Sequence, residues 1–322
     1  MPRIQPPALR SASPLLRQLL IVTRDSSAAA NELRWLKAHA RHRAVQNGKS
    51  WQTLLRAYCA WRGRHVPLQY ILGSEYFGDL ELRCRKGVLI PRQDTASITT
   101  HLAHLISSSP HLRSQPNLKI LDLCTGTGCI PLLLHHLLSS SIPVHSIGLD
   151  IDLLALSLAR SNLHLHSRSI SPNSSLTFSR ADVLAPSLPE DVIQTLGGRV
   201  DILTANPPYI SPSSLRREAA LSVARYEPRR ALVPPAGDGE AGDVFYPAVL
   251  RHAVAMKAKG VMLEVGDAEQ AVTVATLAKG MFGGRVEIWR DVPSGPEEEM
   301  EGFTVRGEGN VRAVFCCDDQ RF

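Results

Sequence analysis

Several features that define whole classes of protein are missing from this chain. No apolar run is long enough to cross a bilayer, and the run from Leu15 to Val22 is interrupted by Arg17 and Gln18. Aromatic residues make up only 5% of the chain, which is little for a surface that stacks on nucleic-acid bases. The 322 residues are enough for one large α/β domain and a smaller second domain, and a composition of 44% hydrophobic and 20% charged residues is typical of a globular protein that buries a core.

The cysteines lack the spacings that bind metals. None of the six belongs to a CxxC pair, and none combines with histidine in a metal-binding pattern. We therefore expect no metal site, and we interpret the cysteines as reduced thiols of an intracellular compartment. They are Cys59, Cys84, Cys124, Cys129, Cys316 and Cys317.

Acidic residues are absent before Asp25, in a segment that contains Arg3, Arg10, Arg17 and Arg24. An arginine-rich, serine-containing start without acidic residues is typical of mitochondrial transit peptides, whereas an ordinary basic N-terminus is the other interpretation. We expect a location in the mitochondrial matrix, with the cytoplasm as the alternative. The net charge of +6 would suit an acidic or RNA-rich partner, but it describes a plain basic surface equally well.

Residues from about 12 to 70 show helical spacing of apolar side chains, as in Leu15–Leu20 and Trp51–Trp61, and Ser26 with Ser27 is a possible cap of the second helix. We expect a helical substrate-recognition domain over 1–75, whose first 12 to 24 residues form a possible targeting segment.

Residues 76–115 are expected to form a β-hairpin and a linker. Apolar residues alternate with polar ones from Phe77 to Cys84, and Lys86-Gly87 offers a turn before Val88–Ile90. The Ser/Pro-rich segment Ser107–Gln115 is predicted to be a loop.

Strands and helices alternate over 116–322, which predicts a doubly wound, mostly parallel sheet. The last two strands lack a helix between them and are expected to form an antiparallel hairpin at one edge. Polar loops are expected at 167–175 and 234–242, and the acidic stretch Pro296–Glu301 is interpreted as a solvated loop. The predicted strands are Lys119–Leu123, Val144–Leu149, Leu176–Arg180, Val200–Ala205, Gly260–Val265, Val286–Asp291 and Arg312–Cys316, and the predicted helices include Cys129–Leu138 and Leu153–His166.

A glycine-containing loop follows the first of these strands and opens a helix. Gly126 and Gly128 would let the backbone approach a nucleotide-like ligand, since they carry no Cβ. Pro131 stands where a dinucleotide fold would have its third glycine, which is unfavourable for binding a pyrophosphate. Asp122 at the strand end would lie beside a ligand ammonium group, and Thr125 belongs to the same predicted cofactor site.

Two further carboxylates follow the next strands. Asp150 can accept both hydroxyls of a ribose, and Asp182 can accept from an adenine amine. Three acidic residues and an incomplete phosphate loop favour a cationic adenosyl ligand, S-adenosylmethionine, as the cofactor. A nicotinamide-dependent dehydrogenase and purely structural glycine turns remain the alternatives at this point.

The segment Asn206-Pro207-Pro208-Tyr209 ends a buried strand. Two prolines remove two backbone donors, while the carbonyls of Asn206 and Pro207 and the Asn206 side-chain oxygen remain as acceptors. A planar NH2 group offers two donors in one plane. The loop can therefore hold an amide or exocyclic amine against a methyl donor, with Tyr209 stacking on the flat group, and a plain proline-rich turn is the alternative.

These motifs, taken in order, resemble the HemK/PrmC family of protein glutamine methyltransferases that act on peptide-chain release factors. The resemblance covers the chain from about Leu15 to Cys316. The matching segments are Arg64–Gly73, Phe77-Gly78, Val88–Arg92, the glycine loop, Asn206–Tyr209, Tyr226-Glu227-Pro228 and Ala231-Leu232.

The resemblance implies a class I S-adenosylmethionine-dependent methyltransferase with a Rossmann-like, mostly parallel seven-stranded sheet. It implies methyl transfer to the side-chain nitrogen of the glutamine in a Gly-Gly-Gln motif of a release factor. The cofactor would lie around Asp122, Gly126 and Asp150, and the glutamine at Asn206–Tyr209. The enzyme is expected to be a monomer of the fungal mitochondrial branch that needs neither a membrane nor direct contact with nucleic acid.

The chain departs from the family pattern at two positions. Ala96 follows Thr95 where the family usually has an acidic residue, and Cys124 to Gly128 replaces the commoner Gly-Thr-Gly-Ser-Gly. Two rival functions remain: a nucleic-acid amino-methyltransferase and a binding module without activity, of which Ala96 would be the sign. The low aromatic content and an N-terminal domain of mixed charge argue against the first, and intact Asn206–Tyr209 argues against the second.

Overall fold

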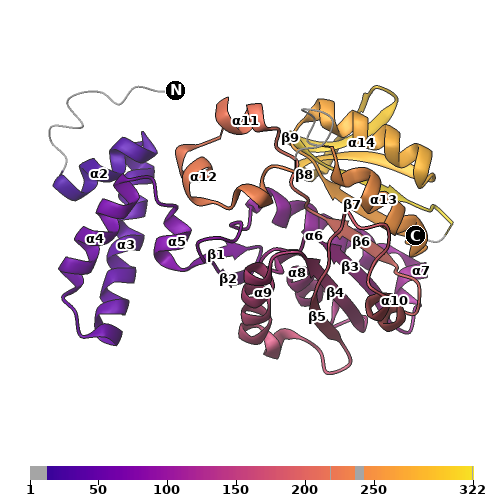
Figure 1. Ribbon diagram of the computed structural model, residues 1–322, viewed down its shortest axis with the longest axis horizontal. Helices are drawn as coiled ribbons and strands as arrows, with labels where there is room; N and C mark the ends of the chain where they lie inside the picture. The colour runs from indigo at the N-terminus through magenta and orange to yellow at the C-terminus, as the bar shows by residue number, and fades with distance from the viewer. Residues whose placement is uncertain (1–12, 218, 236–242, 321) are drawn as a thin grey trace.

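The computed structural model describes residues 13–217, 219–235, 243–320 and 322. These residues form a helical domain, a small hairpin and an α/β domain, which follow one another along the long axis of the molecule (Figure 1). No helix within these ranges has the length and apolar character needed to span a membrane.

The helical domain is built around its own apolar core, which includes Leu19, Leu36 and Cys59. The second helix is capped by Asp25, whose carboxylate accepts from the backbone N–H of Ala28 at 2.7 Å, so the predicted cap at Ser26 was wrong. Residues 1–12 of the predicted targeting segment lie outside the described residues. The helices are α2 (Pro14–Thr23), α3 (Ser26–Asn47), α4 (Trp51–Gly63) and α5 (Leu68–Leu72).

The hairpin that follows turns earlier than the sequence predicted. Strands β1 (Ser74–Phe77) and β2 (Leu80–Arg83) pair around Gly78, which adopts a φ of +56°. Phe77 and Leu82 are fully buried, and this burial sets the register. A turn is present at Lys86-Gly87 as predicted, closed by a hydrogen bond from the N–H of Val88 to the carbonyl of Arg85, but it lies beyond β2 and does not join the two strands of the hairpin.

Two helices connect the hairpin to the sheet, α6 (Gln93–Ser108) and α7 (Pro110–Arg113). The prediction of a loop at 107–115 was wrong, since the hydroxyl of Ser109 caps α7 by accepting from the N–H of Leu112 at 3.1 Å. Ala96 lies on α6 in the apolar core rather than at a ligand site, with 3% of its surface exposed.

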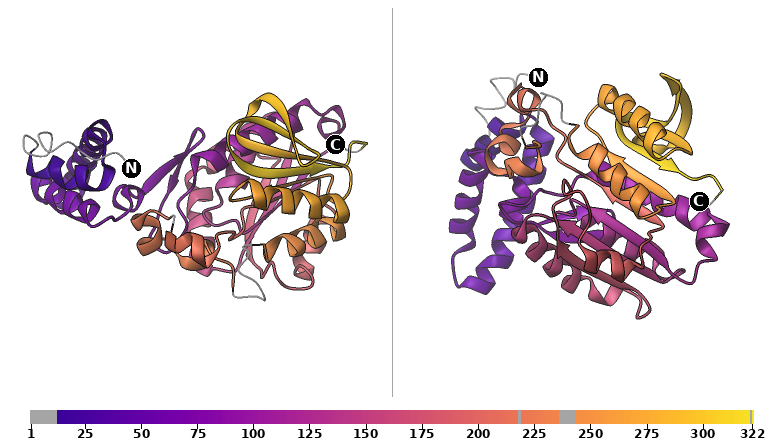
Figure 2. Two further views of the ribbon diagram at one scale, coloured as in Figure 1. Left: turned by 90° about the horizontal axis from the view of Figure 1, so that it is seen from above. Right: turned by 45° about the vertical axis from the view of Figure 1, so that its right-hand side comes forward.

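The central sheet has seven strands in the order β5-β4-β3-β6-β7-β9-β8, with β9 antiparallel to both of its neighbours and the other pairs parallel. Helices α6, α8 and α9 cover one face, and α10, α13 and α14 cover the other (Figure 2). This strand order confirms the predicted fold, since parallel strands with helices on both faces create a crevice at their carboxyl ends. The remaining strands are β3 (Leu118–Leu123), β4 (Val144–Asp150), β5 (Ser175–Arg180), β6 (Ile202–Ala205), β7 (Gly260–Glu264), β8 (Arg285–Met300) and β9 (Phe303–Cys317). The remaining helices are α8 (Cys129–Leu138), α9 (Leu153–Leu165), η1 (Ser167–Ser169), α10 (Glu190–Leu196), α11 (Pro212–Arg217), α12 (Leu221–Tyr226), η2 (Arg229–Ala231), α13 (Phe245–Ala255) and α14 (Ala268–Met281).

The long β8–β9 hairpin folds back on itself. Glu287 of β8 is paired with Phe315 on one side and with Thr304 on the other, and Thr304 is also paired with Glu299. The end of β8 therefore forms the outermost edge of the sheet. The interpretation of Pro296–Glu301 as a loop was wrong, because residues as far as Met300 belong to β8.

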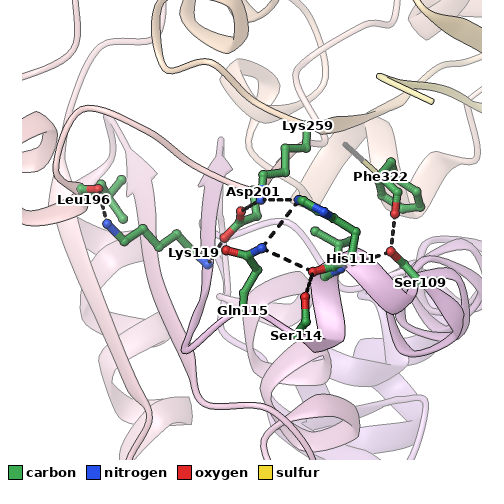
Figure 3. Close-up of polar contacts among 10 residues, drawn as sticks. Ser109, His111, Ser114, Gln115, Lys119, Leu196, Asp201, Lys259 and Phe322 are labelled. Carbon is green, nitrogen blue, oxygen red and sulfur yellow. Dashed lines mark hydrogen bonds and ion pairs between the residues drawn. The ribbon is translucent and has the colours of Figure 1, made fainter. Parts of the chain in front are cut away.

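The amino ends of three central strands are joined by Asp201, which precedes β6 (Figure 3). Its carboxylate accepts from the N–H of Lys119 on β3 at 2.8 Å and pairs with the Nζ of Lys259, just before β7, at 2.8 Å. Lys119 in turn donates to the carbonyl oxygen of Leu196 at the end of α10 (2.7 Å). These contacts fix the amino ends of β3, β6 and β7, at the side of the sheet opposite the predicted cofactor site.

Candidate active site

A cavity of about 420 Å³ opens at the carboxyl ends of β3, β4 and β6. Among the predicted site residues, Gly126, Asp150, Asp182, Asn206 and Pro208 lie on its wall. Asp122, Thr125, Gly128, Pro207 and Tyr209 do not. The other wall residues are Gly87, Val88, Leu89, Cys124, Ile151, Asp152, Ala155, Ala181, Val183, Leu184, Pro228, Arg230, Ala231, Pro235 and Phe245.

Asp150 organises the glycine loop as well as the wall. One oxygen accepts from the N–H of Gly126 and the other from the N–H of Asp152, each at 2.8 Å. Burial raises the pKa of Asp150, while these backbone bonds act in the opposite direction. Each carboxylate oxygen can accept a second hydrogen bond, so the pair can still receive two hydroxyl groups from the cavity side.

The glycine loop needs both of its glycines. Gly126 and Gly128 have positive φ angles of +54° and +77°. A Cβ on Gly128 would lie 2.7 Å from Cζ of Phe178, which is closer than packing allows. Gly128 therefore brings α8 against β5, while Gly126 faces the cavity.

Asp122 lies behind this loop instead of on the wall. It is fully buried, accepts from the hydroxyl of Thr204 at 2.6 Å, and keeps its second carboxylate oxygen without a hydrogen-bond partner among the described residues. Burial raises the pKa of Asp122 to about 7. Thr125 is also buried behind the wall.

The wall suits a cationic adenosyl compound better than a dinucleotide. Asp182 is exposed to the cavity, and one of its oxygens accepts from the N–H of Leu184 at 2.9 Å. A pyrophosphate would bring its negative charges against Asp150 and Asp182, whereas a sulfonium or ammonium group is stabilised by them. No group of His, Cys, Asp and Glu suited to a metal ion occurs among the described residues.

The Asn206–Tyr209 segment presents free acceptors. Within the described ranges, no hydrogen bond engages the Asn206 side chain or the carbonyls of Asn206 and Pro207. Tyr209 does not line the cavity: its hydroxyl donates to Glu264 at 3.1 Å, and its ring lies beside Gly266. In this structure the hydroxyl of Tyr209 is thus engaged with the end of β7, and stacking of the ring on a substrate stays a prediction.

Two ion pairs that sequence reasoning missed shape the cavity wall. Glu227 accepts two bonds from Arg92, at 2.8 and 2.9 Å, and one from the N–H of Ile90 at 3.2 Å. Arg230 approaches Asp152 at 3.4 Å, and both residues lie on the wall. Both residues of the first pair belong to segments that match the family, Val88–Arg92 and Tyr226-Glu227-Pro228, but nothing in the sequence indicates that they meet.

The helical domain is attached directly to this wall. The hydroxyl of Tyr70 donates to the carbonyl of Val88, a wall residue, at 2.6 Å. From the other side, the hydroxyl of Tyr226 donates to the carbonyl of Arg64 at 3.0 Å. A protein bound to the helical domain would therefore be held next to the cavity.

Comparison with known proteins identifies relatives over most of the chain, although no protein family model matches it. The probable MRF1 mitochondrial N(5)-glutamine methyltransferase of Schizosaccharomyces pombe is 31% identical over 290 residues, which cover 86% of this chain and 89% of that protein. The mitochondrial MRF1 N(5)-glutamine methyltransferase of Saccharomyces cerevisiae is 34% identical over 72% of this chain and 68% of its own. The release factor glutamine methyltransferase of Bacillus subtilis is 30% identical over 70% and 72%.

Solved structures with similar folds include a putative class I S-adenosylmethionine-dependent methyltransferase from Listeria monocytogenes (16% identity, 95% and 88% of the two chains, TM-score 0.45). Another is the METTL16 methyltransferase domain (14% identity, 82% and 81%, TM-score 0.47). Given the identity shared with the fungal and bacterial enzymes over most of its length, this chain belongs to the family of the release factor glutamine methyltransferases, enzymes that use S-adenosylmethionine as methyl donor.

Proposed function

We propose that this enzyme methylates the side-chain amide nitrogen of the glutamine in the Gly-Gly-Gln loop of a mitochondrial release factor. The observation that carries the proposal is the set of acceptors on Asn206 and Pro207 beside the cavity, which no donor among the described residues engages. The names of the two fungal relatives, both mitochondrial enzymes acting on MRF1, support the substrate class and the location.

The chain's own contribution is to position the amide. An amide nitrogen is a poor nucleophile, because its lone pair is delocalised into the carbonyl group. Bound S-adenosylmethionine supplies an electrophilic methyl group. Asn206 and Pro207 would accept hydrogen bonds from both hydrogens of the amide and fix its orientation. Such positioning can lower the activation free energy by on the order of 7 kcal/mol or more.

The same wall would hold the cofactor. Asp150 would accept from the ribose hydroxyls and Asp182 from the adenine amine, while Gly126 gives the ligand room to approach the backbone. Asp122 and Thr125 would support the loop from behind. Apolar wall residues such as Leu89 and Phe245 would exclude water from the reacting groups.

The test is to replace Asn206 by alanine. We expect the affinity for S-adenosylmethionine to stay within about 0.5 kcal/mol, while methyl transfer falls on the order of a hundredfold. Asn117→Ala, at the opposite edge of the sheet, is the control. Mass spectrometry of the wild-type reaction should place one methyl group on the glutamine of the release factor. Methylation of DNA or RNA, with none on that glutamine, would assign the enzyme to the nucleic-acid class instead.

A further inference from the structure

Tyr209 is held at three points by residues outside its own loop. Its hydroxyl donates to Oε1 of Glu264 at 3.1 Å, and its carbonyl accepts from Nε2 of Gln270 at 3.3 Å. A Cβ added at Gly266 would lie 3.2 Å from Cδ2 of the ring, which shows how closely the ring approaches that backbone. The end of β7 and the start of α14 thus form a seat for the tyrosine.

Glu264 is the centre of this seat. Only 1% of its surface is exposed, and each carboxylate oxygen accepts one hydroxyl: Oε1 from Tyr209, and Oε2 from Thr95 of α6 at 2.7 Å. No ion pair reaches Glu264 from the described residues. The nearby charges are Asp94 of α6 and Arg312 of β9, and these two pair with each other at 3.0 Å.

A buried carboxylate without an ion pair is unfavourable for stability. The pKa of Glu264 is raised to about 7, chiefly by burial and to a smaller extent by Asp94, while Thr95, Tyr209 and Arg312 act in the opposite direction. A glutamine or an apolar residue at this position would be less unfavourable for the free energy of folding. The arrangement therefore indicates a task other than stability.

Gln270 completes the seat. Its Nε2 also donates to Asp243 at 2.7 Å, and its Oε1 accepts from the N–H of Gly266 at 2.8 Å. The hydroxyl of Tyr246 donates to the backbone carbonyl of Glu264 at 3.0 Å. Glu264 and Gln270, which form these hydrogen bonds with Tyr209, are therefore themselves held by further hydrogen bonds.

We propose that Glu264, held by Thr95, is a positioning residue for methyl transfer: it fixes Tyr209 and, through it, the acceptors of Asn206 and Pro207. This inference rests on the proposed function. The segment Pro91–Thr95 supplies three of the contacts behind the site: Arg92 pairs with Glu227, Asp94 pairs with Arg312, and Thr95 donates to Glu264.

The first test compares Tyr209→Phe, Glu264→Gln and the double variant. Each single change weakens the same hydrogen bond, so each should lower kcat about tenfold, and the double variant should show about the same loss rather than a hundredfold one. Affinity for S-adenosylmethionine, measured by calorimetry, should change less than about twofold, because Tyr209 and Glu264 do not line the cavity.

The second test uses α6. Thr95→Val removes the hydroxyl and should lower kcat, whereas Thr95→Ser keeps it and should restore wild-type activity. Thr99→Val is the matched control, because Thr99 is equally buried on the same helix but donates to the carbonyl of Thr95 rather than to Glu264.

The pH dependence of kcat distinguishes a positioning role of Glu264 from a role in stability alone. Both hydroxyls can donate to Glu264 only when the carboxylate is ionised, so wild-type kcat should fall as the pH drops below about 7, and Glu264→Gln should remove this dependence. Additive losses in the double variant, or losses that follow weaker cofactor binding, would overturn the inference. A wild-type enzyme that methylates no release-factor glutamine would overturn the proposed function and this inference with it.

Discussion

Asp122 and Glu264 are carboxylates placed where a negative charge is unfavourable. Asp122 is the penultimate residue of β3, behind the glycine loop, and Glu264 is the last residue of β7, behind Tyr209. Neither residue lines the cavity, so each could act on a ligand only through other groups. Burial raises the pKa of each to about 7, which links the pH to the stability of the fold.

We expect Asp122 to make the protein less stable as the pH rises. Its pKa in the folded state, about 7, lies above the unfolded value of about 3.9, so the folded state binds the proton more tightly. The stabilisation is complete below the unfolded value and is lost as the pH rises through the folded value. Between pH 5 and pH 8 this effect should lower the free energy of unfolding of the wild type by on the order of 1–3 kcal/mol, and Asp122→Asn should abolish that decrease. Urea unfolding without cofactor measures it. An unchanged pH dependence in the variant would contradict the assignment.

Asp150 is the residue that we expect to matter most for cofactor affinity. Asp150→Ala should weaken binding of S-adenosylmethionine by about 1–3 kcal/mol, since it removes acceptors for the ligand and for the N–H of Gly126. Calorimetry can measure this, with Asp191→Ala on the exposed face of α10 as the control. Tighter binding of NAD than of S-adenosylmethionine by the wild-type enzyme would be incompatible with the proposed site.

At the scale of the element, sequence patterns predicted those helices and strands whose formation depends on neighbouring residues. The helix Cys129–Leu138 and the central strands were predicted within one or two residues, because long apolar runs mark buried elements. The acidic end of β8 was missed, since its pairing depends on a hairpin that folds back on itself. Likewise, Glu264 and Thr95 are 169 residues apart and Glu227 and Arg92 are 135 apart, so the sequence gives no sign that they meet.

Asp201 provides a test at this scale, because it joins three strands at their amino ends. Asp201→Ala should lower the free energy of unfolding by about 2–4 kcal/mol, since it leaves the N–H of Lys119 and the ammonium of Lys259 without their acceptor. Cofactor affinity should remain unchanged, because the cavity lies at the other ends of these strands. Denaturant unfolding and calorimetry measure the two quantities. A variant that lost cofactor binding at full stability would show that the two edges are coupled.

At the scale of the whole molecule, the charge is divided unevenly. Residues 14–73 contain ten basic side chains and two acidic ones, whereas 74–322 contain 24 basic and 28 acidic ones. The description of the N-terminal domain as mixed in charge was therefore wrong, and it no longer argues against an anionic partner. The helical domain is thus cationic and the rest of the chain mildly anionic. The two are joined by hydrogen bonds beside the cavity wall (Figure 1).

This division predicts that recognition of the folded substrate depends on salt. KM for the release factor should rise with ionic strength, while KM for a short Gly-Gly-Gln peptide should change little, since salt screens contacts with the cationic helical domain that only the whole factor would make. Replacing the exposed Arg34, Lys37 and Arg41 by glutamate should raise KM for the protein substrate alone. Reversal of Arg199 and Lys257, at the far edge of the sheet, is the matched control. Equal salt dependence for both substrates would exclude the helical domain as the source.

The folded-back end of the β8–β9 hairpin has a consequence for the behaviour of the protein in concentrated solution. A sheet with an open edge can add strands from another molecule and aggregate. Here the outermost strand presents three consecutive glutamates, Glu297 to Glu299, with exposed side chains. A second copy approaching this edge in antiparallel register would place like charges opposite one another, which is unfavourable. We therefore expect the acidic stretch to disfavour self-association through this edge of the sheet.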